Sequence, residues 1–148
     1  MDIGNNDSEF ILQDEDLLYS VLSTGQQVTT FKTNEPLNNR VVILTEHRWK
    51  EHILIYHYEM KDFLLEIQDC VEAPIFITRN EEDPNRENFL KIINDGNSNV
   101  LIKTIVEFDY SDISNRGIIG NVITSFRTID WSQFYLEGGI IYDATKRK

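Results

Sequence analysis

The sequence predicts an α+β fold, with N-terminal helices packed on a four- to five-stranded antiparallel sheet meander. Apolar residues recur at helical spacing over residues 49–71, and the pattern changes to short β-type runs after Pro74. Polar turn sequences separate these runs from one another. Because the helical segments precede the strands instead of alternating with them, the pattern is typical of an α+β domain.

The first part of the chain is polar and acidic. We expect residues 1–35 to be an acidic N-terminal extension and residues 36–148 to form the folded domain. Within the extension, 15–22 could form a short helix with Gly25 as its stop, and 28–32 is a candidate strand.

Two helices are predicted at the start of the folded domain. A short apolar run over 41–44 is expected to be a strand, and Thr45 after it is suited to cap a helix. Pro74 disfavours helical geometry in the residue before it, so the second helix should end there. The predicted buried stripes of the two helices are Trp49, Ile53, Tyr56 and Met60, then Leu64, Ile67 and Val71.

Beyond Pro74 the sequence predicts strands. The candidate segments are 75–78, 88–93, 100–108 and 118–128. Simple alternation along the last of them separates two sets of side chains. These are Val122, Thr124 and Phe126 on one face, and Asn121, Ile123, Ser125 and Arg127 on the other.

Composition indicates a globular protein without a membrane segment. Hydrophobic residues make up 41% of the chain, and no apolar run approaches the roughly 20 residues that cross a bilayer. No basic stretch followed by an apolar block opens the sequence, so we expect no signal peptide. The single cysteine, Cys70, cannot form an internal disulfide, and we expect it to be a small core residue of a cytoplasmic protein.

The charge balance bears on partners. With 14 basic and 25 acidic residues, the formal net charge is −11. A surface of this sign repels nucleic acid at long range and favours basic protein partners. Net charge does not fix the local field, so both RNA and a basic protein stay possible partners.

All three histidines lie within one predicted helical segment, at positions 47, 52 and 57. Residues five apart on a helix differ in direction by about 140°, so the three rings diverge and a shared metal site is not expected. We expect no cofactor. His52 could be a core histidine or a half-buried proton-transfer group at the seam between helix and sheet. His57 could be a solvated helix end or turn toward the sheet, and His47 is expected to be exposed.

Several short motifs follow one another in an informative order. The central one is His52-Ile53 followed by His57-Tyr58-Glu59. The others are Leu44-Thr45-Glu46, Ala73-Pro74, Arg86 with Phe89-Leu90-Lys91, Val100 to Val106, Val122-Ile123-Thr124-Ser125-Phe126 and Glu137-Gly138-Gly139-Ile140-Ile141-Tyr142. Over roughly residues 40–143, this order resembles phage and bacterial proteins with a barnase–EndoU–colicin–RelE-like nuclease fold.

The resemblance implies metal-independent RNA cleavage by a toxin or mobile-element effector. That reaction needs proton transfer to and from ribose and leaving oxygens, and donors for the charged phosphorane. The implied catalytic residues are His52, His57 and Thr124, and the implied phosphate contacts are Lys91, Lys103, Ser125 and Arg127. The residues taken alone also allow a structural interpretation, in which Lys103 and Arg127 are on an exposed sheet face and Thr124 is in the core.

The sequence departs from the family pattern at three positions. Tyr58 replaces a proline, Leu90 a tyrosine, and Phe126 a tyrosine whose hydroxyl could take part in the chemistry. The alternative function is therefore a catalytically weak acidic binding protein, such as an inhibitor, immunity or anti-defence protein, on the same scaffold.

Overall fold

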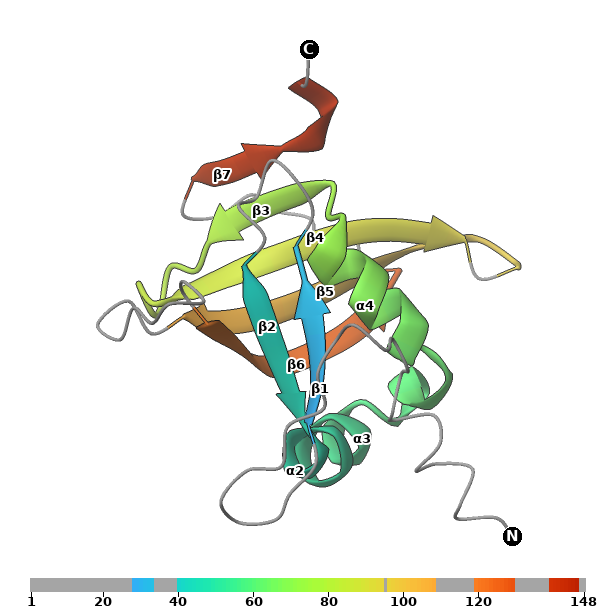
Figure 1. The fold of residues 1–148 in the computed structure, drawn as a ribbon. Helices are drawn as coiled ribbons and strands as arrows, with labels where there is room; N and C mark the ends of the chain where they lie inside the picture. Colours follow the sequence, from blue (N-terminus) through green and yellow to red (C-terminus); the bar gives the residue numbers. More distant parts are fainter. Residues whose placement is uncertain (1–27, 34–39, 95, 109–118, 130–138, 147–148) are drawn as a thin grey trace, which may run out of the picture.

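The computed structural model describes residues 28–33, 40–94, 96–108, 119–129 and 139–146. Within these ranges the strands form one mixed sheet in the order β1-β2-β6-β5-β4-β3-β7 (Figure 1). β2 and β6 pair in parallel, and the other neighbours are antiparallel. The strands are β1 Val28–Lys32, β2 Val41–Thr45, β3 Phe76–Arg79, β4 Arg86–Asn94, β5 Asn99–Phe108, β6 Ile119–Thr128 and β7 Ile140–Asp143.

In the described part of the chain, all helical segments except a final 3₁₀ turn lie between β2 and β3. Thr45 caps the first of them, as predicted, because its Oγ1 accepts a hydrogen bond of 3.0 Å from the backbone N–H of Arg48. Trp49, Ile53 and Met60 of the predicted stripe are buried. The prediction is wrong for Tyr56, which is 69% exposed, because the segment has a π-helical centre and ends at His57, so regular α-helical spacing does not hold along it. The bounds are α2 Glu46–Arg48, η1 Trp49–Ile53, α3 Leu54–Tyr56, the 3₁₀ turn η2 Tyr58–Asp62, α4 Leu64–Glu72 and a final 3₁₀ turn, η4, Ala144–Lys146.

The predicted fold class is wrong. The described chain begins with the β1–β2 hairpin, its helices are short and follow that hairpin, and the sheet has seven strands and is mixed. The parallel pairing of 41–43 with 119–121 joins segments far apart in the sequence, so local periodicity could not reveal it. The helix expected over 15–22 and the domain boundary at residue 35 fall outside the described residues.

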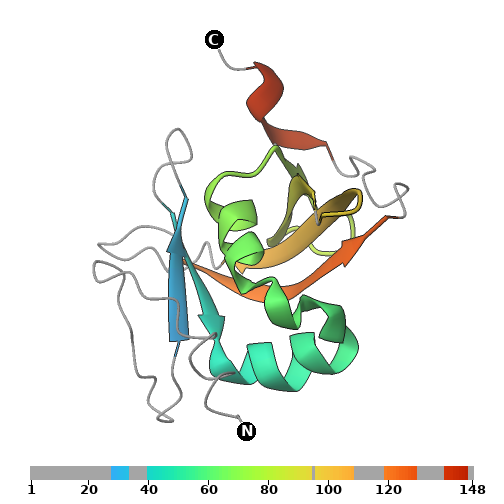
Figure 2. The same cartoon turned by 90° about the vertical axis from the view of Figure 1, so that its right-hand side faces the viewer.

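The sheet is strongly curled, and α4 lies inside the curve. Figure 2 shows α4 between β1 and β2 on one side and β4, β5 and β6 on the other. The predicted stripe of α4 is confirmed, since Leu64, Ile67 and Val71 are buried. They pack with buried residues of the strands and of the first helical segment, namely Phe31, Val42, Leu44, Trp49, Ile53, Met60, Ile77, Phe89, Ile102, Val106, Phe108 and Val122.

Cys70 is also part of this core, as predicted. Its thiol donates to the backbone oxygen of Phe89 over 3.3 Å, and it is fully buried. Burial raises the pKa of the Cys70 thiol to about 12, so at neutral pH the group is an unreactive thiol.

A β-bulge in β6 changes which side chains face the core. Val106 of β5 pairs with Val122 of β6. The residue before Val106, Ile105, pairs with Thr124, so Ile123 has no partner in β5 and is an additional residue in β6. Val122 therefore faces the core, whereas Thr124 and every second residue after it face the other way. The simple alternation predicted for this strand is wrong for that reason.

None of the helices within the described ranges is long and apolar enough to span a membrane.

Candidate functional site

One face of the sheet collects several of the predicted site residues. We call it the outer face, because it is the face turned away from α4. Strand pairing places a row of three side chains across it, in which Lys103 of β5 is directly opposite Leu90 of β4 and Phe126 of β6. Directly opposite residues have Cβ atoms about 5 Å apart, so these side chains are in contact range.

Lys103 is a largely buried cation at the centre of this row. Its relative exposure is 9%, although its cross-strand neighbours Leu90 and Phe126 are apolar. In the described part of the chain, no carboxylate pairs with its ammonium. A lysine stem packed on apolar side chains usually carries its charged end to the edge of the buried region. Leu90 beside it is only 1% exposed, so the outer face is covered around Lys103, and we interpret its ammonium as the cation that this face offers to an anion at the edge of the covered region.

His57 approaches the same row from the helical segment. Its ring stacks on Phe126, with 5.3 Å between ring centroids and 27° between planes. The backbone is fixed on both sides, because the His57 N–H donates to the Ile53 oxygen over 2.6 Å and its oxygen accepts from Met60 over 2.9 Å. The side chain is 31% exposed, so a ligand can reach it.

A carboxylate accompanies the His57 ring. Glu59 Oε2 lies 3.8 Å from His57 Nδ1, and the two form an ion pair whenever the imidazole is protonated. Sequence reasoning did not include Glu59 among the site residues. The signal was present, since Glu59 is the last residue of the His57-Tyr58-Glu59 motif.

Thr124 contributes a hydroxyl to the outer face. It is opposite Ile105 and two residues before Phe126, which makes it a diagonal neighbour of Lys103. Its Oγ1 is buried and has no hydrogen-bond partner among the described residues. A buried hydroxyl is normally hydrogen-bonded, so Thr124 has hydrogen-bonding capacity that the described residues do not use. The expectation that Thr124 packs in the main core together with Val122 is wrong, because the bulge turns it outward.

His52 lies one turn before His57. Its ring is 5.1 Å from the ring of Tyr56, and the side chain is half-buried. Burial, followed by the positive charges of Arg48 and His57, lowers the pKa of His52 below its ordinary value. The His52 imidazole is therefore neutral at pH 7 and can accept a proton.

Lys91 lies apart from the outer face. It is paired with Ile102, whose side chain faces the core, and its ammonium donates to the backbone oxygen of Ala73 over 2.6 Å. Asp69 Oδ2 is 3.4 Å from the same nitrogen. Both partners belong to the C-terminal end of α4, so Lys91 acts as a cap for that helix. The structure does not bring it together with His57.

Ser125 and Arg127 also face the helix side of the sheet. Ser125 is fully buried, and its hydroxyl is 2.9 Å from that of Thr104. The guanidinium of Arg127 lies over the ring of Phe63, 4.7 Å from its centroid. The structure therefore brings together His57, Lys103 and Thr124, and it separates Lys91, Ser125 and Arg127 from them.

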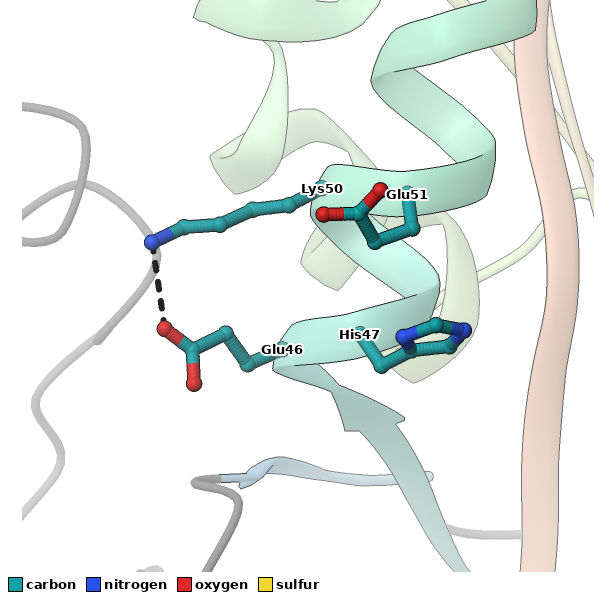
Figure 3. Close-up of a pocket in the computed structure, with 4 residues that line it drawn as sticks. All are labelled: Glu46, His47, Lys50 and Glu51. Carbon is teal, nitrogen blue, oxygen red and sulfur yellow. Dashed lines mark hydrogen bonds and ion pairs between the residues drawn. The ribbon is translucent and has the colours of Figure 1, made fainter.

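His47 lies in a different environment at the start of the helical segment. It lines a shallow surface hollow with Glu46, Lys50 and Glu51, in which Lys50 Nζ pairs with Glu46 Oε2 over 3.1 Å (Figure 3). The His47 side chain is exposed, as predicted. No group of three or more His, Cys, Asp or Glu side chains in the described ranges is arranged to hold a metal ion.

No family model, curated protein or solved structure matches this chain. The resemblance to the nuclease fold therefore depends on the sequence motifs, and a functional conclusion depends on the geometry of the outer face.

Proposed function

We propose that this chain is a ribonuclease-like protein that cleaves RNA by histidine acid–base chemistry without a metal. The observation that carries the proposal is the row on the outer face, where the His57 ring stacks on Phe126 beside Lys103. The row combines a proton-transfer group, a cation and, at Thr124, a hydroxyl without a partner in the described structure.

These groups match the needs of RNA transesterification. A base removes the proton of the ribose 2′-hydroxyl, the 2′-oxygen attacks phosphorus, and the bond from phosphorus to the 5′-oxygen breaks as that oxygen gains a proton. The products are a 2′,3′-cyclic phosphate and a free 5′-hydroxyl. In the proposal His52 and His57 transfer the protons, and Lys103 and Thr124 stabilise the charge that develops on the phosphorane.

The first experiment is a digest of RNA by the purified full chain in excess EDTA. We expect cleavage of total RNA or tRNA at the same rate with EDTA as with added magnesium, and fragments that end in 2′,3′-cyclic phosphates. Intact RNA after long incubation would contradict the proposal. Fragments with 5′-phosphate ends would indicate a different reaction and would also contradict it.

A second candidate function is an acidic binding protein on the same scaffold. Two observations favour it, namely the net charge of −11 and the absence of a hydroxyl on Phe126, the ring that contacts His57. This candidate requires that wild-type protein leave RNA intact. It also requires a basic protein partner whose binding weakens as salt rises and is unchanged by His57→Ala.

A further inference from the structure

Two tyrosines flank His57 and project into solvent. Tyr56 is 69% exposed and Tyr58 is 63% exposed. They are two positions apart in the chain, which places their Cα atoms within about 7 Å of each other. Ile53 and Met60 are the residues near His57 on this segment that pack in the core. The two exposed tyrosine rings beside His57 therefore have no packing role in the core.

Each ring has a nitrogen-bearing side chain beside it. The His52 ring is 5.1 Å from the ring of Tyr56, and the ammonium of Lys61 is 5.8 Å from the centroid of the Tyr58 ring. Arg48, one turn before His52, is close enough to act on His52 electrostatically. The surface is thus an alternation of aromatic and basic groups.

Carboxylates on the same segment offset part of this positive charge. Asp62 Oδ1 is 4.0 Å from the Lys61 ammonium, and Glu59 is beside His57. With these acids nearby and a net charge of −11, the chain repels a polyanion at long range. A ligand for this surface must therefore gain its affinity mainly from contact with the rings.

We propose that Tyr56 and Tyr58 form a stacking platform for the bases of single-stranded RNA on either side of the phosphate that His57 approaches. This inference rests on the proposed function and specifies its substrate. Stacking on aromatic side chains needs bases that are free of a duplex, and it tolerates any base sequence. The expected substrate is accordingly single-stranded RNA with little sequence preference.

The test uses a fluorescein-labelled, fully 2′-O-methylated RNA strand, which cannot be cleaved by attack of the 2′-oxygen. Anisotropy titrations of the full chain should show that Tyr56→Ala and Tyr58→Ala each weaken binding by about tenfold. Tyr56→Phe and Tyr58→Phe should bind like the wild type, because the ring is kept. Ile55→Ala is the matched control, since Ile55 is 62% exposed on the same segment but has no ring, and its binding should not change.

Several outcomes would overturn the platform. Equal affinity of wild type and both alanine variants would do so, as would equal binding of the strand and its duplex. A wild-type dimer that either alanine variant dissociates would assign the rings to a second copy of the chain instead.

The platform and the catalytic proposal can fail separately. Ring-dependent binding by a wild-type chain that does not cleave RNA would retain the platform and refute the nuclease. Cleavage with a KM that both alanine variants leave unchanged would do the reverse.

Discussion

Replacing His57 by alanine is expected to reduce the rate of RNA cleavage by a factor of about 100 or more, the usual effect of losing a general acid or base. The reason is its position, because His57 is the histidine whose ring touches the row that holds Lys103, through its stack on Phe126. The measurement is kcat/KM on a short fluorogenic RNA, in EDTA, with circular dichroism to confirm that the variant is folded.

His47→Ala is the matched control for this prediction. It removes the same kind of side chain from the same helical segment, but His47 lines the separate hollow with Glu46, Lys50 and Glu51. We expect its kcat/KM to stay within about twofold of wild type. If His47→Ala and His57→Ala lowered the rate equally, the assignment of the site to the outer face would be wrong.

Glu87→Ala is expected to destabilise the fold by about 3–5 kcal/mol, as is typical when one member of a buried ion pair is removed. Arg40 and Glu87 form a two-bond pair, with nitrogen–oxygen distances of 3.0 and 3.2 Å, and their side chains are only 16% and 8% exposed. The Arg40 guanidinium also lies 4.3 Å from the centroid of the Phe108 ring. Without Glu87 this cation would remain largely buried beside an apolar ring. The measurement is the free energy of unfolding from urea titration.

Glu107→Ala is the corresponding surface control. Glu107 accepts a 3.0 Å bond from Arg86 Nε, but both side chains are at least a third exposed, so its loss should change the unfolding free energy by about 1 kcal/mol or less. A similar loss of stability in the two variants would show that burial of the Arg40 pair has no special role.

Arg40→Met combined with Glu87→Met should recover much of the stability, because no unpaired charge is left.

Local patterns predicted the strands and one helix well. Val100–Phe108 was recognised as a strand, although residues 100–104 are all buried and the strand does not alternate in burial there. α4 shows its buried stripe of Leu64, Ile67 and Val71 ahead of Pro74, so the sequence carried enough information for this helix. The four-residue strand β7 gave no comparable signal and was recognised only as part of a motif. Strand order is a property of distant pairings, and the parallel contact between β2 and β6 could not be inferred from either segment alone.

The site was predictable in part. His57 and Lys103 were identified from residue type and motif, and the structure places both at the Phe126 ring. The sequence placed Ser125 on the face opposite Val122. The additional residue in β6, Ile123, shifts the alternation of side chains along the strand, so Ser125 faces the same side as Val122. The sequence implied that Lys91 contacts phosphate, but its ammonium binds the backbone oxygen of Ala73 at the end of α4. Nothing in the sequence shows that this oxygen lies close to Lys91.

The most direct test of the proposed site on the outer face is to observe where an uncleavable RNA dinucleotide binds. We would titrate a 2′-O-methyl dinucleotide into ¹⁵N-labelled full-length protein and follow amide chemical shifts. We expect shifts at His57, Lys103 and Phe126 on the outer face, and none at Lys91 and Ala73 at the end of α4. Shifts at Lys91 and Ala73 with none at the outer face, or no shifts at all at millimolar dinucleotide, would contradict the proposed site.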